Sequence, residues 1–114
     1  MADESRMKVV YIAHPLGGGD DREANRARAA RWVAWAGMHG VAPVADWIIL
    51  SGQWDETPEH RERGLRIDVA LVARCDELWL CGNHVSHGMS IEANAAALAG
   101  VTVVNKLTED GEPR

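Results

Sequence analysis

The sequence has few cysteines, no long hydrophobic run and no surplus of basic residues. Its two cysteines, Cys75 and Cys81, form no CxxC pair. Two thiols do not make a disulfide framework, so we expect both to be reduced and buried. No stretch approaches the length of a membrane span, and residues 1–6 are too polar for a secretory signal. These absences predict a cytoplasmic protein without a membrane partner.

The net charge of −5 argues against polymeric nucleic acid or an anionic membrane as a partner. Small phosphorylated ligands remain open, because they need only a local cradle. The 114 residues suffice for one domain, and no internal repeat or linker interrupts them. We expect a single domain over residues 1–114, with a core at about 8–104 and a frayed tail at 108–114.

Two nucleotide-binding fingerprints are also missing. The chain has no GxGxxG and no GK[ST], which excludes a dinucleotide fingerprint and a P-loop. What it does have is a β-branched and aromatic run at 8–13, then glycines at 17–19, then a helical segment to about His39. The glycine-rich loop either approaches a ligand or is only a flexible turn, and both interpretations stay open.

Short apolar runs alternate with helical segments along the whole chain. Strands are expected at 8–13, 41–45, 77–81 and 101–104, and helices at about 20–39, within 46–57, at 57–74 and at 93–99. This order predicts an α/β fold, a single small Rossmann-like or flavodoxin-like domain. Its parallel sheet should have four to five strands, with helices on both faces and Pro43 near an edge.

The first helix carries many small residues and several arginines. A small-residue face is expected against the sheet; it comprises Ala24, Ala27, Ala30, Ala34 and Gly37. The arginines form either a solvated face or a ligand contact or dimer rim; they are Arg22, Arg26, Arg28 and Arg31.

The stretch from Ser86 to Glu92 lies between a predicted strand and the alanine-rich helix. Helix N-terminal amides are unpaired, so Ser86 and the backbone at Gly88 are suited to hold a phosphate or carboxylate. Glu92 would then lie about 6 Å further along the helix, roughly one sugar ring away. Alternatively, Ser86 only caps the helix, Gly88 relieves a turn and Glu92 is solvated.

Three further residues are ambiguous on sequence. Asp68 lies in the apolar part of its helix, where a carboxylate is costly to bury without a partner. It is either a functional carboxyl or a rim residue paired with Arg66 or another arginine. Trp47 and Trp54 either stack on a base or cover the core.

The carboxyl ends of the first and third strands should converge. That convergence would bring together His14, Gly17 to Gly19, Ser86, Gly88 and Glu92. His14, His84 and His87 match no standard ligand spacing, so we expect substrate contact or exposed loops there, and neither a metal nor another cofactor.

Three blocks resemble the nucleoside 2-deoxyribosyltransferase superfamily, in particular its compact phage and bacterial branch. They are Tyr11 to Gly18, Asp68 with residues 75–79, and Ser86-x-Gly88-Met89-x-x-Glu92. The resemblance extends from Lys8 to Val104.

The resemblance implies that Glu92 is the nucleophile that attacks the anomeric carbon of a nucleoside, and that Asp68 assists near the sugar and base. The substrate-binding positions it implies are Tyr11, His14, Gly17, Gly18, Ser86, Gly88 and Met89. The third block is similar to that of 2′-deoxynucleoside 5′-phosphate N-hydrolases, whose serine binds the 5′-phosphate. Those hydrolases have an arginine where this chain has Gly17. A homodimer or higher homo-oligomer is implied as well.

In such a reaction a helix N-terminus helps keep Glu92 ionised, and Asp68 supplies a proton to the departing base. Water or a second base completes the reaction, so hydrolysis and transfer both stay open. A second hypothesis is a nucleotide-binding or sequestering module without turnover. Phosphoribohydrolases that act on purine ribonucleotides are a weaker alternative. Their motif resembles P-G-G-x-G-T-x-x-E, and this chain has no P-G-G before Glu92.

Overall fold

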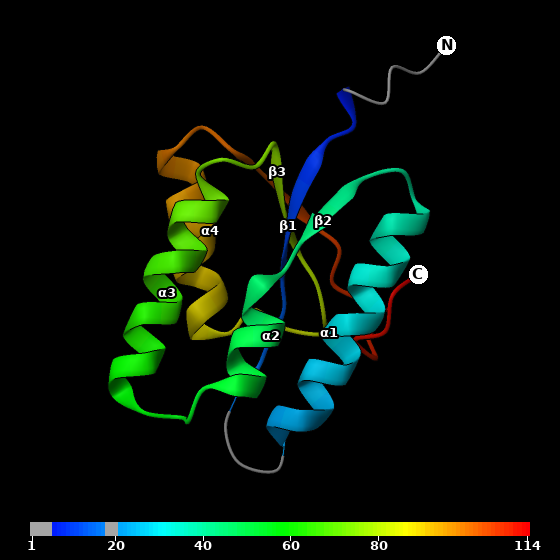
Figure 1. Cartoon of the computed structure of the whole chain (residues 1–114). Coiled ribbons are helices and arrows are strands. Elements are labelled where there is room, and N and C mark those ends of the chain that lie inside the picture. Colours follow the sequence, from blue (N-terminus) through cyan, green and yellow to red (C-terminus); the bar gives the residue numbers. More distant parts are fainter. Residues whose placement is uncertain (1–5, 18–20) are drawn as a thin grey trace.

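The computed structural model describes residues 6–17 and 21–114, and in this part of the chain a parallel four-stranded sheet lies between helices on both faces (Figure 1). The strands are β1 (Val9–Ala13), β2 (Ala42–Val44), β3 (Glu77–Leu80) and β4 (Thr102–Asn105). The helices are α1 (Asp21–Met38), α2 (Asp46–Gln53), α3 (Pro58–Val72) and α4 (His87–Leu98). The predicted Rossmann-like α/β fold is confirmed.

The strands are ordered β2-β1-β3-β4, and every pair is parallel. β2 is therefore an edge strand, as its proline predicted. From β1 the chain moves outward to β2 through α1, then returns across the sheet to β3 through α2 and α3. The direction of winding reverses between β1 and β3, and in such sheets a crevice opens at the carboxyl ends of those strands.

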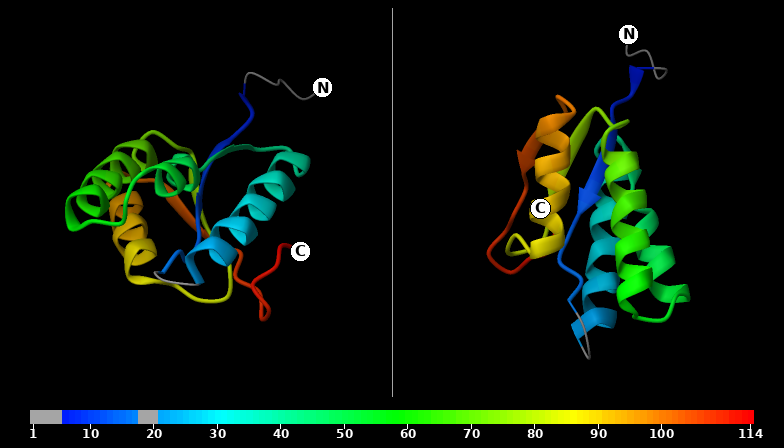
Figure 2. Two further views of the ribbon diagram at one scale, coloured as in Figure 1. Left: turned by 60° about the horizontal axis from the view of Figure 1, so that its bottom comes forward. Right: turned by 90° about the vertical axis from the view of Figure 1, so that its left-hand side faces the viewer.

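Helix α1 covers one face of the sheet, and α2, α3 and α4 cover the other (Figure 2). The residues Val10–Ala13 of β1 have no exposed surface, because both faces of this central strand are covered. Alternate side chains enter different cores. Tyr11 packs with residues of α3 and α4, whereas Ile12 packs with Trp32 of α1.

The predicted orientation of α1 is wrong. The alanines at 24, 27, 30 and 34 and Gly37 are all exposed, and the buried residues of the helix are Ala29, Trp32 and Ala36. A buried tryptophan removes about 150–250 Å² from water, far more than an alanine does, and this outweighs the close approach that small residues permit. The helix is rotated accordingly, which leaves Arg22, Arg26 and Arg28 half-buried beside the buried stripe.

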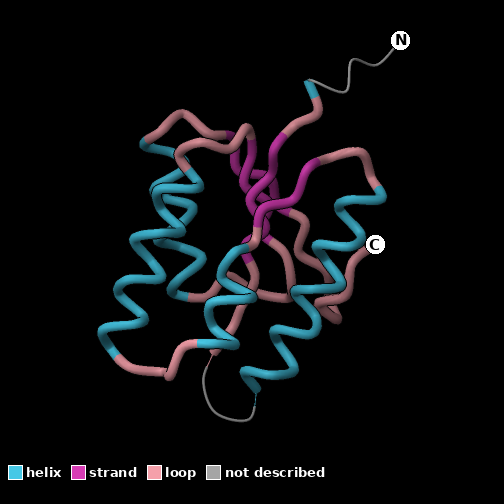
Figure 3. The backbone as a smooth tube through the Cα atoms, viewed as in Figure 1, coloured by secondary structure: helices cyan, strands magenta, loops and turns pink. Residues whose placement is uncertain are grey.

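The prediction of a frayed C-terminal tail is wrong. The indole nitrogen of Trp32 donates to the carbonyl of Gly111 at 2.7 Å, and the guanidinium of Arg31 donates to both oxygens of Glu112 at 2.8 and 2.7 Å. The amide of Thr108, the first residue of the tail, donates to the carbonyl of Gly82 at 2.9 Å. The tail is fastened to α1 by a buried hydrogen bond and a two-point ion pair, and Figure 3 shows it running back beside that helix.

Gly111 is expected to be sensitive to substitution. It has a φ of +80°, where an L-residue is strained by about 1 kcal/mol. We expect Gly111→Ala to lower the melting temperature by about 4 °C. Gly37→Ala, in an exposed turn of α1 with nothing within 4 Å of the new Cβ, should instead raise it slightly. Equal melting temperatures for the two variants in differential scanning calorimetry would contradict the docked tail.

Both cysteines are free and buried. Among the residues that the structure describes, no helix combines the length and apolar character needed to cross a membrane.

Candidate functional site

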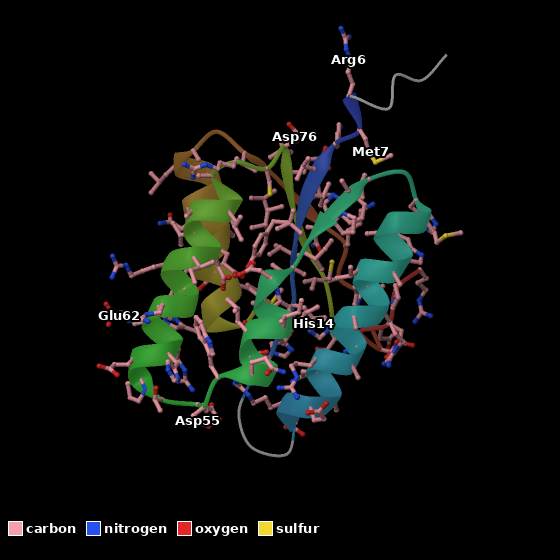
Figure 4. The ribbon with its side chains drawn as sticks, in the orientation of Figure 1. Arg6, Met7, His14, Asp55, Glu62 and Asp76 are labelled. Carbon is pink, nitrogen blue, oxygen red and sulfur yellow. The ribbon has the colours of Figure 1, made fainter. Side chains whose placement is uncertain are left out.

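A pocket of about 480 Å³ opens at the carboxyl ends of β1 and β3. Its walls come from the loop after β1, the start of α1, α2 and the loop that follows it, α3 as far as Asp68, and the start of α4. Figure 4 shows His14 and Asp55 toward this end of the molecule, with Asp76 and Met7 at the opposite end. The lining includes seven of the predicted residues, which are His14, Gly17, Asp68, Ser86, Gly88, Met89 and Glu92. Gly18 and Gly19 lie outside the described residues.

Glu92 lies in the second turn of α4 and is only 6% exposed. The hydroxyl of Tyr11 donates to its Oε2 at 2.8 Å. Tyr11 is itself fully buried and absent from the pocket lining, so it holds the carboxyl of Glu92 from behind rather than facing a ligand.

The expectation that the helix N-terminus keeps Glu92 ionised is not met. Burial raises the pKa of Glu92 to about 7, although the hydrogen bond from Tyr11 and the contact with Asp68 act in the opposite direction. The influence of the helix dipole is confined to the first turn, and Glu92 lies beyond it. Desolvation therefore outweighs the dipole at this position.

Asp68 is 7% exposed and lines the same pocket. Its Oδ1 has no hydrogen-bond partner among the described residues, and no arginine pairs with it there. The alternative interpretation as an arginine-paired rim residue is therefore wrong. Burial raises the pKa of Asp68 to about 8, and the neighbouring charges of Glu92 and Asp46 act in the same direction. A carboxyl group in this environment holds its proton at neutral pH.

Asp46 belongs to the same cluster and was missed on sequence. It is the first residue of α2, and both of its carboxyl oxygens are buried without a hydrogen-bond partner among the described residues. Burial raises its pKa, and its side chain interacts with that of Asp68. The available signal was an acidic residue directly after the second predicted strand, where carboxyl ends gather.

His14 is neutral and held at both ring nitrogens. Its Nδ1 donates to the carbonyl of Pro15 at 2.6 Å, which leaves Nε2 to accept from Nε of Arg28 at 3.1 Å. These two partners assign the tautomer. Burial lowers the pKa of His14 to about 4, so it contributes a neutral wall to the pocket rather than a proton donor.

Gly82, at the end of β3, allows the two strand ends to come close. It has a φ of +96°, and a Cβ there would lie 2.8 Å from Cδ of Pro15 and 3.2 Å from the His14 ring. Only glycine combines this backbone angle with so close an approach. Gly82 does not line the pocket, but it supports His14, which does, and its role went unnoticed on sequence.

Ser86 is the N-cap of α4. Its Oγ accepts from the amide of Met89 at 3.3 Å, and the amide of Ser86 contacts Sδ of Met89 at the same distance. Met89 is 1% exposed and belongs to the core as well as to the pocket wall. A Cβ built on Gly88 meets no protein atom within 4 Å, so the backbone here is open on the pocket side.

Aromatic and charged groups form the outer part of the pocket. Trp47 is 9% exposed and donates its indole NH to the carbonyl of Ile12 at 3.0 Å, so it is a core residue with an edge in the lining. Trp54 is half-buried and lies 5.3 Å from the His60 ring. At the rim, Arg22 and Arg61 lie 3.8 and 2.7 Å from the same oxygen of Glu56.

Within residues 6–17 and 21–114, no three histidine, cysteine, aspartate or glutamate side chains are arranged to hold a metal ion. Because burial raises the pKa values of Asp46, Asp68 and Glu92, the cluster holds bound protons to higher pH than exposed carboxyls do. This arrangement can supply a nucleophilic or charge-stabilising carboxylate and a neighbouring carboxylic acid to one bound ligand.

The sequence profile described as "Domain of unknown function (DUF7768)" matches residues 8–106. No curated protein matches the chain significantly.

Proposed function

We propose, from the premise that this chain belongs to the DUF7768 family of domains of unknown function, that its pocket cleaves the N-glycosidic bond of a nucleoside or nucleoside 5′-monophosphate. The observation that carries the proposal is the pair of buried carboxyls in the pocket, Glu92 held by Tyr11 and Asp68 beside it. The resemblance to nucleoside 2-deoxyribosyltransferases supports the same reaction. With it we propose a cytoplasmic protein that forms a homodimer or higher homo-oligomer.

The pair contains the groups that the reaction needs. Glu92, as the carboxylate, attacks C1′ and forms a glycosyl ester, while the electrons of the broken C–N bond pass to the base. Asp68 transfers its proton to the departing base. Water or a second base then attacks C1′, releases Glu92 and returns a proton to Asp68.

The order of the two pKa values is favourable to this division of work. Burial raises both, but the hydroxyl of Tyr11 donates to Glu92 and favours its ionised form. Oδ1 of Asp68 has no donor among the described residues, and the neighbouring charges raise the pKa of Asp68 further. A single proton shared by the pair therefore resides mainly on Asp68. Two carboxyls whose environments separate their pKa values are typical of acid and nucleophile pairs in glycoside chemistry.

A binding module without turnover is the second candidate. Two observations favour it: the raised pKa of Glu92, which reduces the fraction of carboxylate at neutral pH, and the engagement of Ser86 Oγ in capping α4. Under this hypothesis the pocket binds a nucleotide and leaves it intact.

The test is base release from a panel of deoxyribonucleosides, ribonucleosides and their 5′-monophosphates, followed by chromatography. Half of the reactions contain a free acceptor base. We expect release of base by the wild type, and dependence on the acceptor separates transfer from hydrolysis. If no substrate is cleaved while a ligand raises the melting temperature, the enzyme hypothesis fails and the binding module is the better account.

Gly88→Val tests whether the start of α4 receives a 5′-phosphate. Because a Cβ at Gly88 meets no protein atom within 4 Å, the valine should fold normally and block only a ligand's approach. We expect the preference for dCMP over deoxycytidine, measured as the ratio of kcat/KM values, to fall by about tenfold, which corresponds to one lost hydrogen bond to a charged group. An unchanged ratio would contradict the hypothesis that the start of α4 binds the 5′-phosphate.

A further inference from the structure

We propose that Asp46 is a positioning residue that shares a proton with Asp68 and thereby keeps the Asp68 carboxyl protonated beside Glu92. For its catalytic consequence this inference rests on the proposed function. Its structural content, a shared proton between two buried carboxyls, can be tested without any substrate.

The three carboxyls come from three different helices. Asp46 begins α2, Asp68 lies within α3, and Glu92 lies within α4. Both oxygens of Asp46 and Oδ1 of Asp68 are shielded from solvent and lack a hydrogen-bond donor among the described residues. Orphaned carboxylate oxygens are costly to bury. The interaction between the side chains of Asp46 and Asp68 becomes a hydrogen bond only when one of them carries a proton.

The surroundings of the two carboxyls decide which one holds the proton. The backbone amides of Asp46 and Trp47, at the start of α2, favour the ionised form of Asp46 without closing a hydrogen bond to its oxygens. Asp68 lies between the negative charges of Asp46 and Glu92, and both raise its pKa. Asp68 therefore holds the proton, and Asp46 accepts the hydrogen bond.

The other groups that face the cluster do not reverse this assignment. Tyr11 of β1 interacts with both Glu92 and Asp68, and its own pKa is raised by burial and by their charges, so it stays a neutral donor. His14, in the wall of the same pocket, is neutral because burial lowers its pKa. Arg22 and Arg61 are paired with Glu56 at the rim. A proton on Asp68, which interacts with both Asp46 and Glu92, therefore compensates negative charge in the cluster.

Infrared spectroscopy of protein labelled with ¹³C at the aspartate carboxyls tests the shared proton directly. In the wild type we expect a carbonyl band of a protonated aspartate at neutral pH, and its loss in Asp68→Asn. Asp46→Asn should move the titration midpoint of this band down by about one pH unit or more, because it removes a like charge next to Asp68. Asp46→Ala, whose side chain cannot hydrogen-bond, should shift the midpoint in the same direction.

Asp21→Asn is the matched control, because Asp21 is exposed at the start of α1. It should leave the midpoint where it is. A midpoint unchanged in both Asp46 variants, or a protonated band that survives in Asp68→Asn, would overturn the proposal.

Kinetics provide the second readout. With a cleaved substrate, the upper limb of the pH profile of kcat/KM should move down in Asp46→Asn by the same amount as the infrared midpoint, with KM nearly unchanged. If no substrate is cleaved and the infrared midpoint still shifts, proton sharing stands and the proposed function fails. If cleavage occurs and neither quantity shifts, the proposed function stands and the role of Asp46 fails.

Discussion

Glu92→Gln is expected to lower the rate of base release by about 10³-fold or more, since an amide cannot replace a carboxylate nucleophile. The substitution preserves the size of the side chain and its ability to accept a hydrogen bond from Tyr11. Burial raises the pKa of Glu92, so its site favours a neutral side chain and the fold should tolerate the amide. Affinity for a nucleotide, measured by calorimetry, should stay within about threefold of the wild type.

The control is Glu109→Gln, an exposed residue outside the pocket lining. It should retain full activity. Base release by Glu92→Gln at the rate of this control would remove Glu92 from the mechanism. Loss of nucleotide binding in Glu92→Gln, without loss of fold, would instead make Glu92 a recognition residue and favour the binding module.

Asp68→Asn is expected to have the second largest effect, about 10²–10⁴-fold on base release, as is usual for removal of a general acid. The loss should depend on the leaving group. An N7-methylated purine nucleoside departs as a neutral base without receiving a proton, so its cleavage should be nearly independent of Asp68. An equal loss for methylated and unmethylated substrates would contradict the role of Asp68 as the proton donor.

The same substitution is expected to change the pH dependence of stability. The pKa values of Asp68 and Glu92 are raised in the folded protein, so the native state binds more protons than the unfolded state between about pH 4 and neutrality. This contribution to the free energy of unfolding is complete below the unfolded pKa. It is lost as the pH rises through the folded values.

The wild type should therefore be less stable at pH 8.5 than at pH 5.5, and Asp68→Asn should reduce that difference. Each unit of pKa shift corresponds to about 1.4 kcal/mol, so the gain at pH 8.5 should raise the melting temperature by about 4 °C or more. Thermal melts of both proteins at the two pH values provide the measurement. A wild type that becomes more stable with rising pH would contradict a protonated cluster.

The hydrophobic periodicity, together with residues typical of helix and strand ends, predicted most of the fold. Pro58 with Thr57 before it marked the start of α3, and the Thr57 side chain does accept from the amide of His60 at 3.1 Å. The orientation of α1 was missed, because small residues with the right spacing concealed the larger gain from burying Trp32. The tail was missed because its partners lie far away in the sequence, as with Glu112 and Arg31.

Only part of the site was predicted, because some of its contacts join residues that are far apart in the sequence. Glu92 and Asp68 stood out because one follows a glycine-containing helix start and the other interrupts an apolar run. The signal at Asp46, an acid directly after a predicted strand, was weaker, since an acid in the first turn of a helix is ordinary on its own. Only the packing of α2 against α3 brings its carboxyl to Asp68. The neutral state of His14 likewise depends on its burial, and Arg28 acts in the same direction; a sequence pattern shows neither.

Trapping the glycosyl ester is the most direct test of the central claim. The enzyme is mixed with the best substrate of the panel, quenched in acid during turnover, and measured by intact mass and by peptide mapping. We expect an added mass of one sugar, or of one sugar 5′-phosphate, on the peptide that contains Glu92, and none in Glu92→Gln. Base release without any adduct, or an adduct on another residue, would contradict Glu92 as the nucleophile.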